Sequence, residues 1–210
     1  MSVNVLISED LRSRRFSLDM VVLARVIRRT HKRLPTRVLV VGCGNGRDAA
    51  QLAVSLDADV TGVDLRSRFD VDAARFATLR TGNPGALEFA DGAFDFIYSQ
   101  LGFSDVSGLR ASLYQMSRVL AHGGGFCLRL PARSGLTPPG LRSELIAAFG
   151  EAADVTNSYY QDRYRDAPGA AKWFWRTSLG SALLSSRYFV GRRAAREAER
   201  PLVKRRSLLR

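Results

Sequence analysis

Short apolar runs alternate with stretches of helical periodicity along this chain. The run Val-Leu-Val-Val at 38–41 is continuous and mostly β-branched, which is typical of a strand buried on both faces of a parallel sheet. Comparable runs recur, bounded by Gly, Pro, Asn or Asp. The predicted strands are 36–41, 59–64, 76–81, 94–99, 126–130, 155–160 and 187–191.

Helical periodicity accounts for most of the intervals between these strands. Leu18, Val22 and Val26 form one apolar stripe, which predicts an amphipathic helix at 18–29. Further helices are predicted at 47–56, 109–120, 141–149 and 172–184. Strands that alternate with helices indicate an α/β fold with a mostly parallel sheet.

The interval between 64 and 76 is too short for an ordinary helical connection. About a dozen residues separate the second and third predicted strands, close to the lower limit for a parallel crossover. These residues include the charged Arg66, Arg68, Asp70 and Asp72. We therefore expect a reduced crossover between strands 2 and 3.

A glycine-rich turn follows the first strand, and a carboxylate follows the second. The turn at 42–46 reads Gly-Cys-Gly-Asn-Gly, and glycines in such a turn let a ligand approach the main chain closely. Asp64 ends the second strand, where it can accept hydrogen bonds from a ribose diol. The two features together predict a pocket for a nucleoside-containing cofactor.

The third glycine of the turn separates two cofactor classes. The dinucleotide fingerprint is G-x-G-x-x-G, whose last glycine allows close helix–strand packing under a pyrophosphate. In this chain the third glycine is Gly46, and Arg47 stands where the last fingerprint glycine would be. This long charged side chain disfavours the dinucleotide geometry, so a dehydrogenase is the least favoured activity.

The G-x-G-x-G spacing resembles the first motif of class I S-adenosylmethionine-dependent methyltransferases (methyltransferase type 11-like). The segment LEFADGAFDFIYS at 87–99 is similar to the one that leads into their fourth strand. MSRVLAHGGGF at 116–126 is similar to their next helix, turn and fifth strand. Three motifs in this order cover roughly 36–131. The resemblance implies a Rossmann-like, doubly wound, mostly parallel seven-stranded sheet with S-adenosylmethionine as cofactor.

The resemblance also implies which residues hold this cofactor. The loop at 42–46 matches the loop under the methionine part, and Asp64 matches the acidic residue that holds the ribose hydroxyls. Asn83 replaces the family's usual Asp near the adenine amine, and its carbonyl can still accept from that amine. The complete predicted set is Gly42, Cys43, Gly44, Asn45, Gly46, Asp64, Leu65, Asn83, Ser99 and Gln100.

The implied reaction is methyl transfer to a small-molecule or biosynthetic-intermediate acceptor by in-line displacement. Such a protein mainly aligns the reactants, and it needs a general base only when the acceptor must lose a proton. No catalytic residue is therefore assigned. His122, in a predicted turn, and Cys43, between glycines, are interpreted as structural. The sequence has no paired Cys or His at zinc spacing, so no metal is expected.

Two other functions stay open beside this one. The first is an RNA-directed methyltransferase, motivated by basic ends. Residues 1–37 hold nine Lys or Arg against three Asp or Glu, and residues 187–210 hold nine against two, within a net charge of +12. Such ends can also contact another polyanion or an anionic membrane. The second alternative is a non-catalytic scaffold, motivated by Asn83 and the short segment at 64–76.

The same patterns suggest how the chain is organised. We expect an N-terminal amphipathic helical cap at 1–35, a methyltransferase domain at 36–191 and a basic C-terminal tail at 192–210. The acceptor pocket is expected from the segments 1–36 and after 131. Two cysteines make no disulfide framework, and no apolar run in the sequence is long enough to span a bilayer. A cytoplasmic protein is therefore expected.

Overall fold

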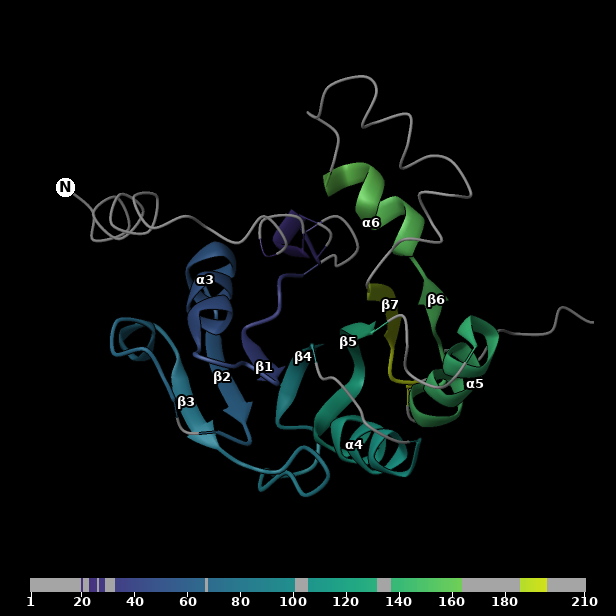
Figure 1. Ribbon diagram of the computed structural model, residues 1–210, viewed down its shortest axis with the longest axis horizontal. Helices are drawn as coiled ribbons and strands as arrows, with labels where there is room; N and C mark the ends of the chain where they lie inside the picture. The colour runs from purple at the N-terminus through teal and green to yellow at the C-terminus, as the bar shows by residue number, and fades with distance from the viewer. Residues whose placement is uncertain are drawn as a thin grey trace, which may run out of the picture.

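The structure is a computed structural model that describes residues 20, 23–25, 27–28, 33–66, 68–100, 106–131, 137–163 and 186–195 (Figure 1). Its elements in chain order are β1 (Arg37–Val41), α3 (Arg47–Leu56), β2 (Asp59–Asp64), the 3-10 turn η1 (Ala73–Arg75), β3 (Thr78–Thr81), β4 (Phe94–Ser99), α4 (Val106–Val119), β5 (Leu120–Pro131), α5 (Pro138–Phe149), β6 (Ala153–Asp154), α6 (Thr156–Arg163) and β7 (Ser186–Arg192).

The strands form a single seven-stranded sheet in the order β3-β2-β1-β4-β5-β7-β6. Strands β1 to β5 pair in parallel, whereas β7 pairs antiparallel with both β5 and β6. The strand order reverses between β1 and β4, and α/β proteins bind ligands outside the carboxyl ends of the strands at such a point. The predicted mostly parallel, seven-stranded α/β sheet is confirmed.

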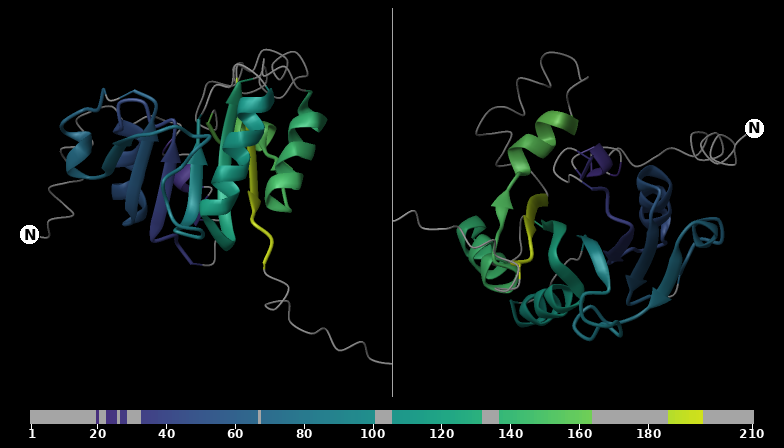
Figure 2. Two further views of the ribbon diagram at one scale, coloured as in Figure 1. Left: turned by 90° about the horizontal axis from the view of Figure 1, so that it is seen from below. Right: turned by 180° about the vertical axis from the view of Figure 1, so that it is seen from behind.

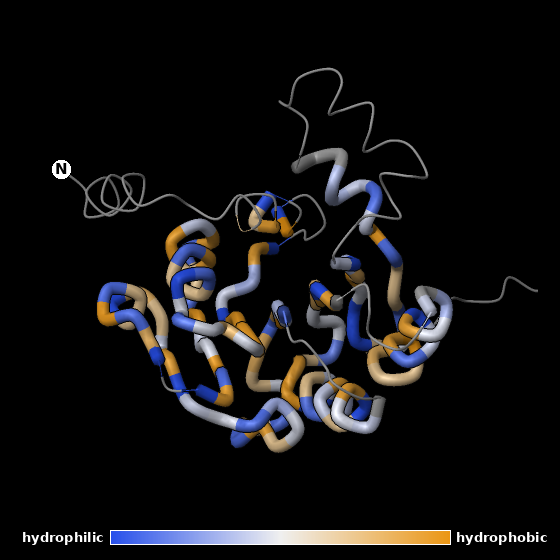
Figure 3. Tube along the Cα trace, viewed as in Figure 1, coloured by the Kyte–Doolittle hydropathy of each residue, from blue (hydrophilic) through white to orange (hydrophobic). Residues whose placement is uncertain are grey.

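Helices cover both faces of the sheet (Figures 1 and 2). One face packs against α3, α6 and the N-terminal helical residues 20, 23–25 and 27–28, and we call it the α3 face. The opposite face packs against α4 and α5. Apolar and polar residues alternate around α3 and α5 in Figure 3, as expected for helices with one buried side.

The reduced crossover between β2 and β3 is confirmed. Among the residues that the structure describes between these strands, η1 alone is helical, and it contacts α3 and β3. An ion pair fastens this segment to the start of α3, because Arg47 Nε lies 2.6 Å from Asp70 Oδ2. The Asp70 N–H also donates to the Asn45 carbonyl at 2.9 Å. The crossover is therefore short but firmly connected to the glycine turn.

One strand prediction is wrong. The segment 155–160 was expected to be a strand, but it forms most of α6, and the strand β6 precedes it. Asp154 Oδ1 accepts from the Thr156 N–H at 2.9 Å, an interaction that favours the start of a helix. The Thr156 hydroxyl in turn accepts from the Tyr188 N–H at 3.0 Å. These polar contacts outweigh the β propensity of the Val and Tyr residues.

Two strands begin two or more residues away from the expected position. β5 begins at Leu120 instead of 126, so the expected turn at 122–125 is part of the strand. The extra residues lie at a register shift against β4, where a Cβ on Gly124 would come within 2.9 Å of the Asp95 carbonyl. β3 begins at Thr78 instead of 76, because the Phe76 and Ala77 N–H groups donate back to Ala73.

Several expectations concern parts of the chain outside the described residues. They include the helix at 172–184, most of the helical cap at 1–35 and the tail after 195. Within the described residues, no helix combines the length and the apolar character needed to cross a membrane.

Candidate functional site

The glycine turn connects the end of β1 to the start of α3. The Gly42 N–H donates to the Val63 carbonyl at 2.8 Å, and the Gly46 N–H donates to the Cys43 carbonyl at 2.9 Å. Gly46 has φ +86° and is the N-cap of α3. A Cβ on Gly46 would lie 2.3 Å from Leu79 Cδ1, so this position requires glycine for both conformation and space.

Gly44 differs from Gly46 in its surroundings. It also has a positive φ, +57°, but no atom lies within 4 Å of the position that its Cβ would occupy. The residue is exposed at the carboxyl end of the sheet. Its main chain therefore offers an open surface at the place where the sequence predicts the methionine part of a cofactor.

Asp64 is fastened to this turn by its side chain. Its Oδ2 accepts from the Gly44 N–H at 2.9 Å, and its Oδ1 accepts from the Arg66 N–H at 3.0 Å. A carboxylate has about four acceptor positions, so both oxygens keep capacity for ligand hydroxyls. The next residue, Leu65, is 65% exposed and places an apolar side chain beside the carboxylate.

Asn83 follows β3 at the same edge of the sheet. The Gly82 N–H donates to the Asp64 carbonyl at 2.9 Å, which joins the ends of β2 and β3. Asn83 Oδ1 accepts from the Gly85 N–H at 2.9 Å. The oxygen that was expected to accept from an adenine amine therefore already takes part in a turn and keeps one lone pair for a ligand.

Ser99 and Gln100 lie at the end of β4. Ser99 is completely buried, and its hydroxyl has no hydrogen-bond partner among the described residues. The Gln100 N–H donates to the Val41 carbonyl at 3.1 Å, and its Nε2 donates to Asp48 Oδ2 at 3.0 Å. The predicted site residues are thus brought together at the carboxyl ends of β1, β2, β3 and β4.

Asp48 is a further member of this group, which none of the sequence motifs indicated. It lies in the first turn of α3, where a carboxylate interacts favourably with the helix dipole. Its position two residues after the last glycine could have revealed it. Its bond to Gln100 connects the glycine turn to the end of β4, so these two segments hold each other in position.

Two residues interpreted as structural lie in structural surroundings. Cys43 is buried, and burial, followed by the nearby Asp64 charge, raises the pKa of its thiol to about 12. It is therefore protonated and unreactive at neutral pH. His122 Nδ1 lies 2.9 Å from the Ala194 carbonyl, and its place near the amino end of β5 is remote from the glycine turn. Among the described residues, no group of three His, Cys, Asp or Glu could hold a metal ion.

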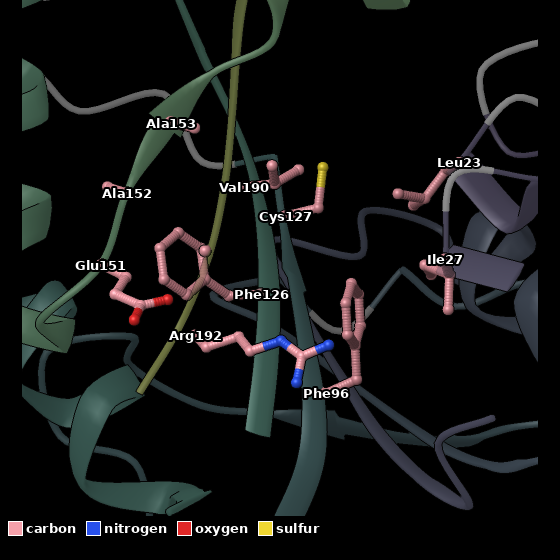
Figure 4. Close-up of a pocket in the computed structure, with 11 residues that line it drawn as sticks. Leu23, Ile27, Phe96, Phe126, Cys127, Glu151, Ala152, Ala153, Val190 and Arg192 are labelled. Atoms are coloured by element: carbon pink, nitrogen blue, oxygen red, sulfur yellow. The ribbon is translucent and has the colours of Figure 1, made fainter. Parts of the chain in front are cut away.

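A separate apolar pocket of about 280 Å³ opens on the α3 face (Figure 4). Leu23 and Ile27 line one side of it, and Phe126 and Val190 line the other. Its lining contains none of the predicted cofactor residues. This pocket is therefore distinct from the group at the carboxyl edge.

The strand order, with an antiparallel β7 between β5 and β6, is that of the class I methyltransferase fold. Residues 38–124 match the sequence model of a methyltransferase domain. This match spans the glycine turn, Asp64 and Asn83, and it supports S-adenosylmethionine as the cofactor.

Relatives with known names agree with this assignment. An O-methyltransferase of Aspergillus nomiae is 31% identical over 97 residues, which cover 41% of this chain and 43% of that protein. The 27-O-demethylrifamycin SV methyltransferase of Amycolatopsis mediterranei is 26% identical over 144 residues, 62% of this chain and 53% of that protein. The chain thus spans about half the length of these relatives.

Solved structures share the fold at low sequence identity. Phosphoethanolamine N-methyltransferase 2 of Haemonchus contortus with bound S-adenosyl-L-methionine has a TM-score of 0.58 at 15% identity, covering 83% of this chain and 52% of that chain. The [4+2]-cyclase SpnF has a TM-score of 0.56 at 18% identity, covering 83% and 80%. Because one of these proteins is a cyclase, the fold does not by itself determine the reaction.

The residues at the carboxyl edge fit this cofactor. The space at Gly44 admits a ligand against the main chain, and Asp64 is held by two main-chain donors with acceptor capacity left over. Such a fixed carboxylate suits a ribose diol. Leu65 adds an exposed apolar side chain of the kind that can contact a planar base.

Proposed function

We propose that this protein transfers the methyl group of S-adenosylmethionine to a small-molecule or biosynthetic-intermediate acceptor. The observation that carries the proposal is the Gly44–Asp64 hydrogen bond beside an open main chain, at the switch point of the sheet. Small-molecule acceptors are supported by the relatives, one of which is named for 27-O-demethylrifamycin SV.

The chemistry needs little from the side chains. The cofactor would supply a methyl group bound to a sulfonium sulfur. In-line attack of the acceptor atom on the methyl carbon would release that sulfur as a neutral thioether. Asp64, Gly44 and Asn83 bind and orient the cofactor, and Ser99 and Gln100 border it on the acceptor side. Alignment and exclusion of water account for most of the rate gain in this scheme. No general base is assigned.

Calorimetric titration with S-adenosylmethionine and S-adenosylhomocysteine tests the cofactor site. Asp64→Asn has only one acceptor oxygen for the two N–H donors of Gly44 and Arg66, and it removes the charge. It should weaken both ligands at least tenfold, about 1.4 kcal/mol. Asp59→Asn is the matched control, because Asp59 is an exposed carboxylate at the other end of β2. Equal affinities for wild type and Asp64→Asn would disprove this assignment.

A second candidate is a scaffold that binds without turnover. The hydrogen bond of Asn83 within its own turn and the reduced crossover favour it. Turnover decides between the two: a screen of hydroxylated and amine acceptors with radiolabelled cofactor should give a methylated product that Asp64→Asn abolishes. Cofactor binding without any product would favour the scaffold.

We further propose the domain division at 1–35, 36–191 and 192–210. One sheet runs from Arg37 to Arg192, one residue past the boundary at 191, which supports a single central domain. Leu23 and Ile27 are buried on the α3 face, which supports a covering role for the N-terminal helix. Contact of the basic ends with RNA, another polyanion or an anionic membrane stays a prediction, as does a cytoplasmic location.

A further inference from the structure

The reduced crossover between β2 and β3 is connected to the glycine turn through Asp70. Its Oδ2 accepts from Arg47 Nε at 2.6 Å, and its N–H donates to the Asn45 carbonyl at 2.9 Å. Its Oδ1 accepts from the Asp72 N–H at 2.9 Å, and its carbonyl accepts from the Ala74 N–H at 3.1 Å. One residue therefore joins η1 to the turn at 42–46.

Asn45 is the residue of the turn that these contacts fix. Its carbonyl accepts from the Asp70 N–H, and its Oδ1 accepts from the Arg47 N–H at 3.2 Å. The preceding residue, Gly44, has an open main chain and donates its N–H to Asp64 Oδ2 at 2.9 Å. The turn is therefore held by one carboxylate at the end of β2 and by a second carboxylate in the crossover.

The ion pair between Arg47 and Asp70 contributes little to the stability of α3. Arg47 is the first residue of this helix, where the helix dipole opposes a positive charge. Its side chain is 71% exposed, and ion pairs at such exposed positions contribute little to folding. The hydrogen bond from Arg47 lowers the pKa of Asp70, so the pair is charged at neutral pH. We therefore expect its effect in the local conformation of the turn.

We propose that Asp70 and Arg47 are positioning residues for the cofactor, because they hold the glycine turn in its binding conformation before S-adenosylmethionine binds. This proposal rests on the proposed function, since it takes the turn and Asp64 as the cofactor site. Three glycines of the turn have positive φ, and glycines leave an unsupported turn many conformations. A turn that is already fixed spares the cofactor this ordering cost. The short crossover thus supports the site instead of weakening it.

Calorimetric titration of the full chain with S-adenosylhomocysteine tests the proposal. Asp70→Asn keeps the size of the side chain and an acceptor oxygen for the Asp72 N–H, but it loses the charge that holds Arg47. Arg47→Gln removes the other partner of the pair. Each variant should weaken binding about threefold to tenfold. The double variant should weaken it no more than the stronger single variant does, because both substitutions remove the same interaction.

Glu144→Gln is the matched control. Glu144 pairs with Arg110 at 2.6 Å, the same distance as in the Arg47–Asp70 pair. The side chains of Arg110 and Glu144 are 65% and 22% exposed, close to the 71% and 18% of Arg47 and Asp70. The control pair joins α4 to α5, so its loss should leave the affinity for S-adenosylhomocysteine unchanged.

Two further measurements separate positioning from a general structural role. Urea unfolding of ligand-free Arg47→Gln should give a stability that matches or exceeds that of wild type, because the charge opposed by the helix dipole is gone. Hydrogen exchange of the amides at 42–47 should be faster in ligand-free Asp70→Asn than in wild type. Saturation with S-adenosylhomocysteine should restore the wild-type exchange rate, because the ligand then orders the turn.

Four results overturn the proposal. Wild-type affinity in both Asp70→Asn and Arg47→Gln removes the positioning role and leaves the cofactor site intact. An equal loss of affinity in Glu144→Gln, or additive losses in the double variant, also removes it. A loss of affinity in Arg47→Gln that accompanies an equal loss of stability assigns the pair to folding. No binding by folded wild type overturns both this proposal and the proposed function.

Discussion

Gly46→Ala is the substitution whose effect on stability follows most directly from the structure. The new Cβ would lie 2.3 Å from Leu79 Cδ1, well inside van der Waals contact. Leu79 also packs closely on Gly62 of β2, where a Cβ would lie 2.8 Å from its Cδ2, so moving the Leu79 side chain disturbs this second contact. The alanine must also adopt φ +86° at the start of α3.

The expected loss combines two effects. An L-residue in the left-handed region costs about 1–2 kcal/mol, and overpacking of a core costs about 1–3 kcal/mol. Gly46→Ala should therefore lower the free energy of unfolding by about 2–5 kcal/mol, against a usual total of about 5–15 kcal/mol. The protein should remain folded at room temperature but unfold at a clearly lower urea concentration.

Gly44→Ala is the matched control. It carries the same kind of backbone strain at φ +57° but meets no atom within 4 Å, so its loss should be only about 1–2 kcal/mol. The affinity for S-adenosylhomocysteine should show the opposite order. Gly44→Ala fills the open surface that the cofactor is proposed to occupy, and it should weaken binding at least tenfold, about 1.4 kcal/mol.

Urea unfolding followed by circular dichroism measures the stability of both variants. The double variant Gly46→Ala/Leu79→Ala should show a coupling energy of about 1 kcal/mol or more, because the smaller side chain removes the contact. If Gly46→Ala and Gly44→Ala differ in stability by less than about 0.5 kcal/mol, the Leu79 contact has no energetic role and the reasoning fails.

Three further predictions concern the framework of the domain. Asp95 accepts from Thr36 and from Arg37, the first residue of β1. Although burial raises the pKa of Asp95, these bonds lower it overall. Asp95→Asn should therefore lower the free energy of unfolding by about 1–3 kcal/mol at pH 7. Urea unfolding at a series of pH values should show that this difference shrinks below about pH 4. Arg118→Met leaves two main-chain carbonyls without their donor, so limited proteolysis should cut 82–93 faster. Cys43 and Cys127, with pKa values of about 12, should resist iodoacetamide at pH 8 until urea unfolds the protein.

For each of these three predictions, one experimental result would contradict it. A constant stability difference between wild type and Asp95→Asn from pH 7 to pH 3 would mean that the carboxylate charge has no role. An unchanged cleavage pattern in Arg118→Met would show that other contacts hold the segment. Rapid alkylation of either cysteine in the folded protein would contradict its burial.

The sequence was sufficient for the elements whose signals are local. The bounds of β2, β4 and α3 agree with the prediction, because continuous apolar runs and a glycine turn mark them directly. The same local signals located the turn at 42–46 and Asp64, which the structure joins by a hydrogen bond. Order along the chain was enough to place Asn83 and Gln100 at the same edge of the sheet.

The remaining features depend on contacts between distant segments. Tyr159 was expected on a strand, but it lies on α6 and stacks on Tyr188 of β7. The two residues are 29 positions apart, and no local pattern indicates this contact. Arg129 is one polar position in an apolar strand, and only the pairing of β5 with β7 places Tyr188 beside it. Asp48 belongs to the site through Gln100, which follows a different strand.

The position of β7 has a consequence for synthesis on the ribosome. β7 follows β6 by more than thirty positions in the sequence, yet it lies between β5 and β6. Until β7 has emerged, β5 presents an open edge and β6 has no strand beside it. The first five strands can assemble during elongation, whereas Tyr188 arrives late and only then stacks on Tyr159 of α6. Nascent chains that pause before Ser186 therefore expose β5 to pairing with other chains, and this interval is when a chaperone would be most useful.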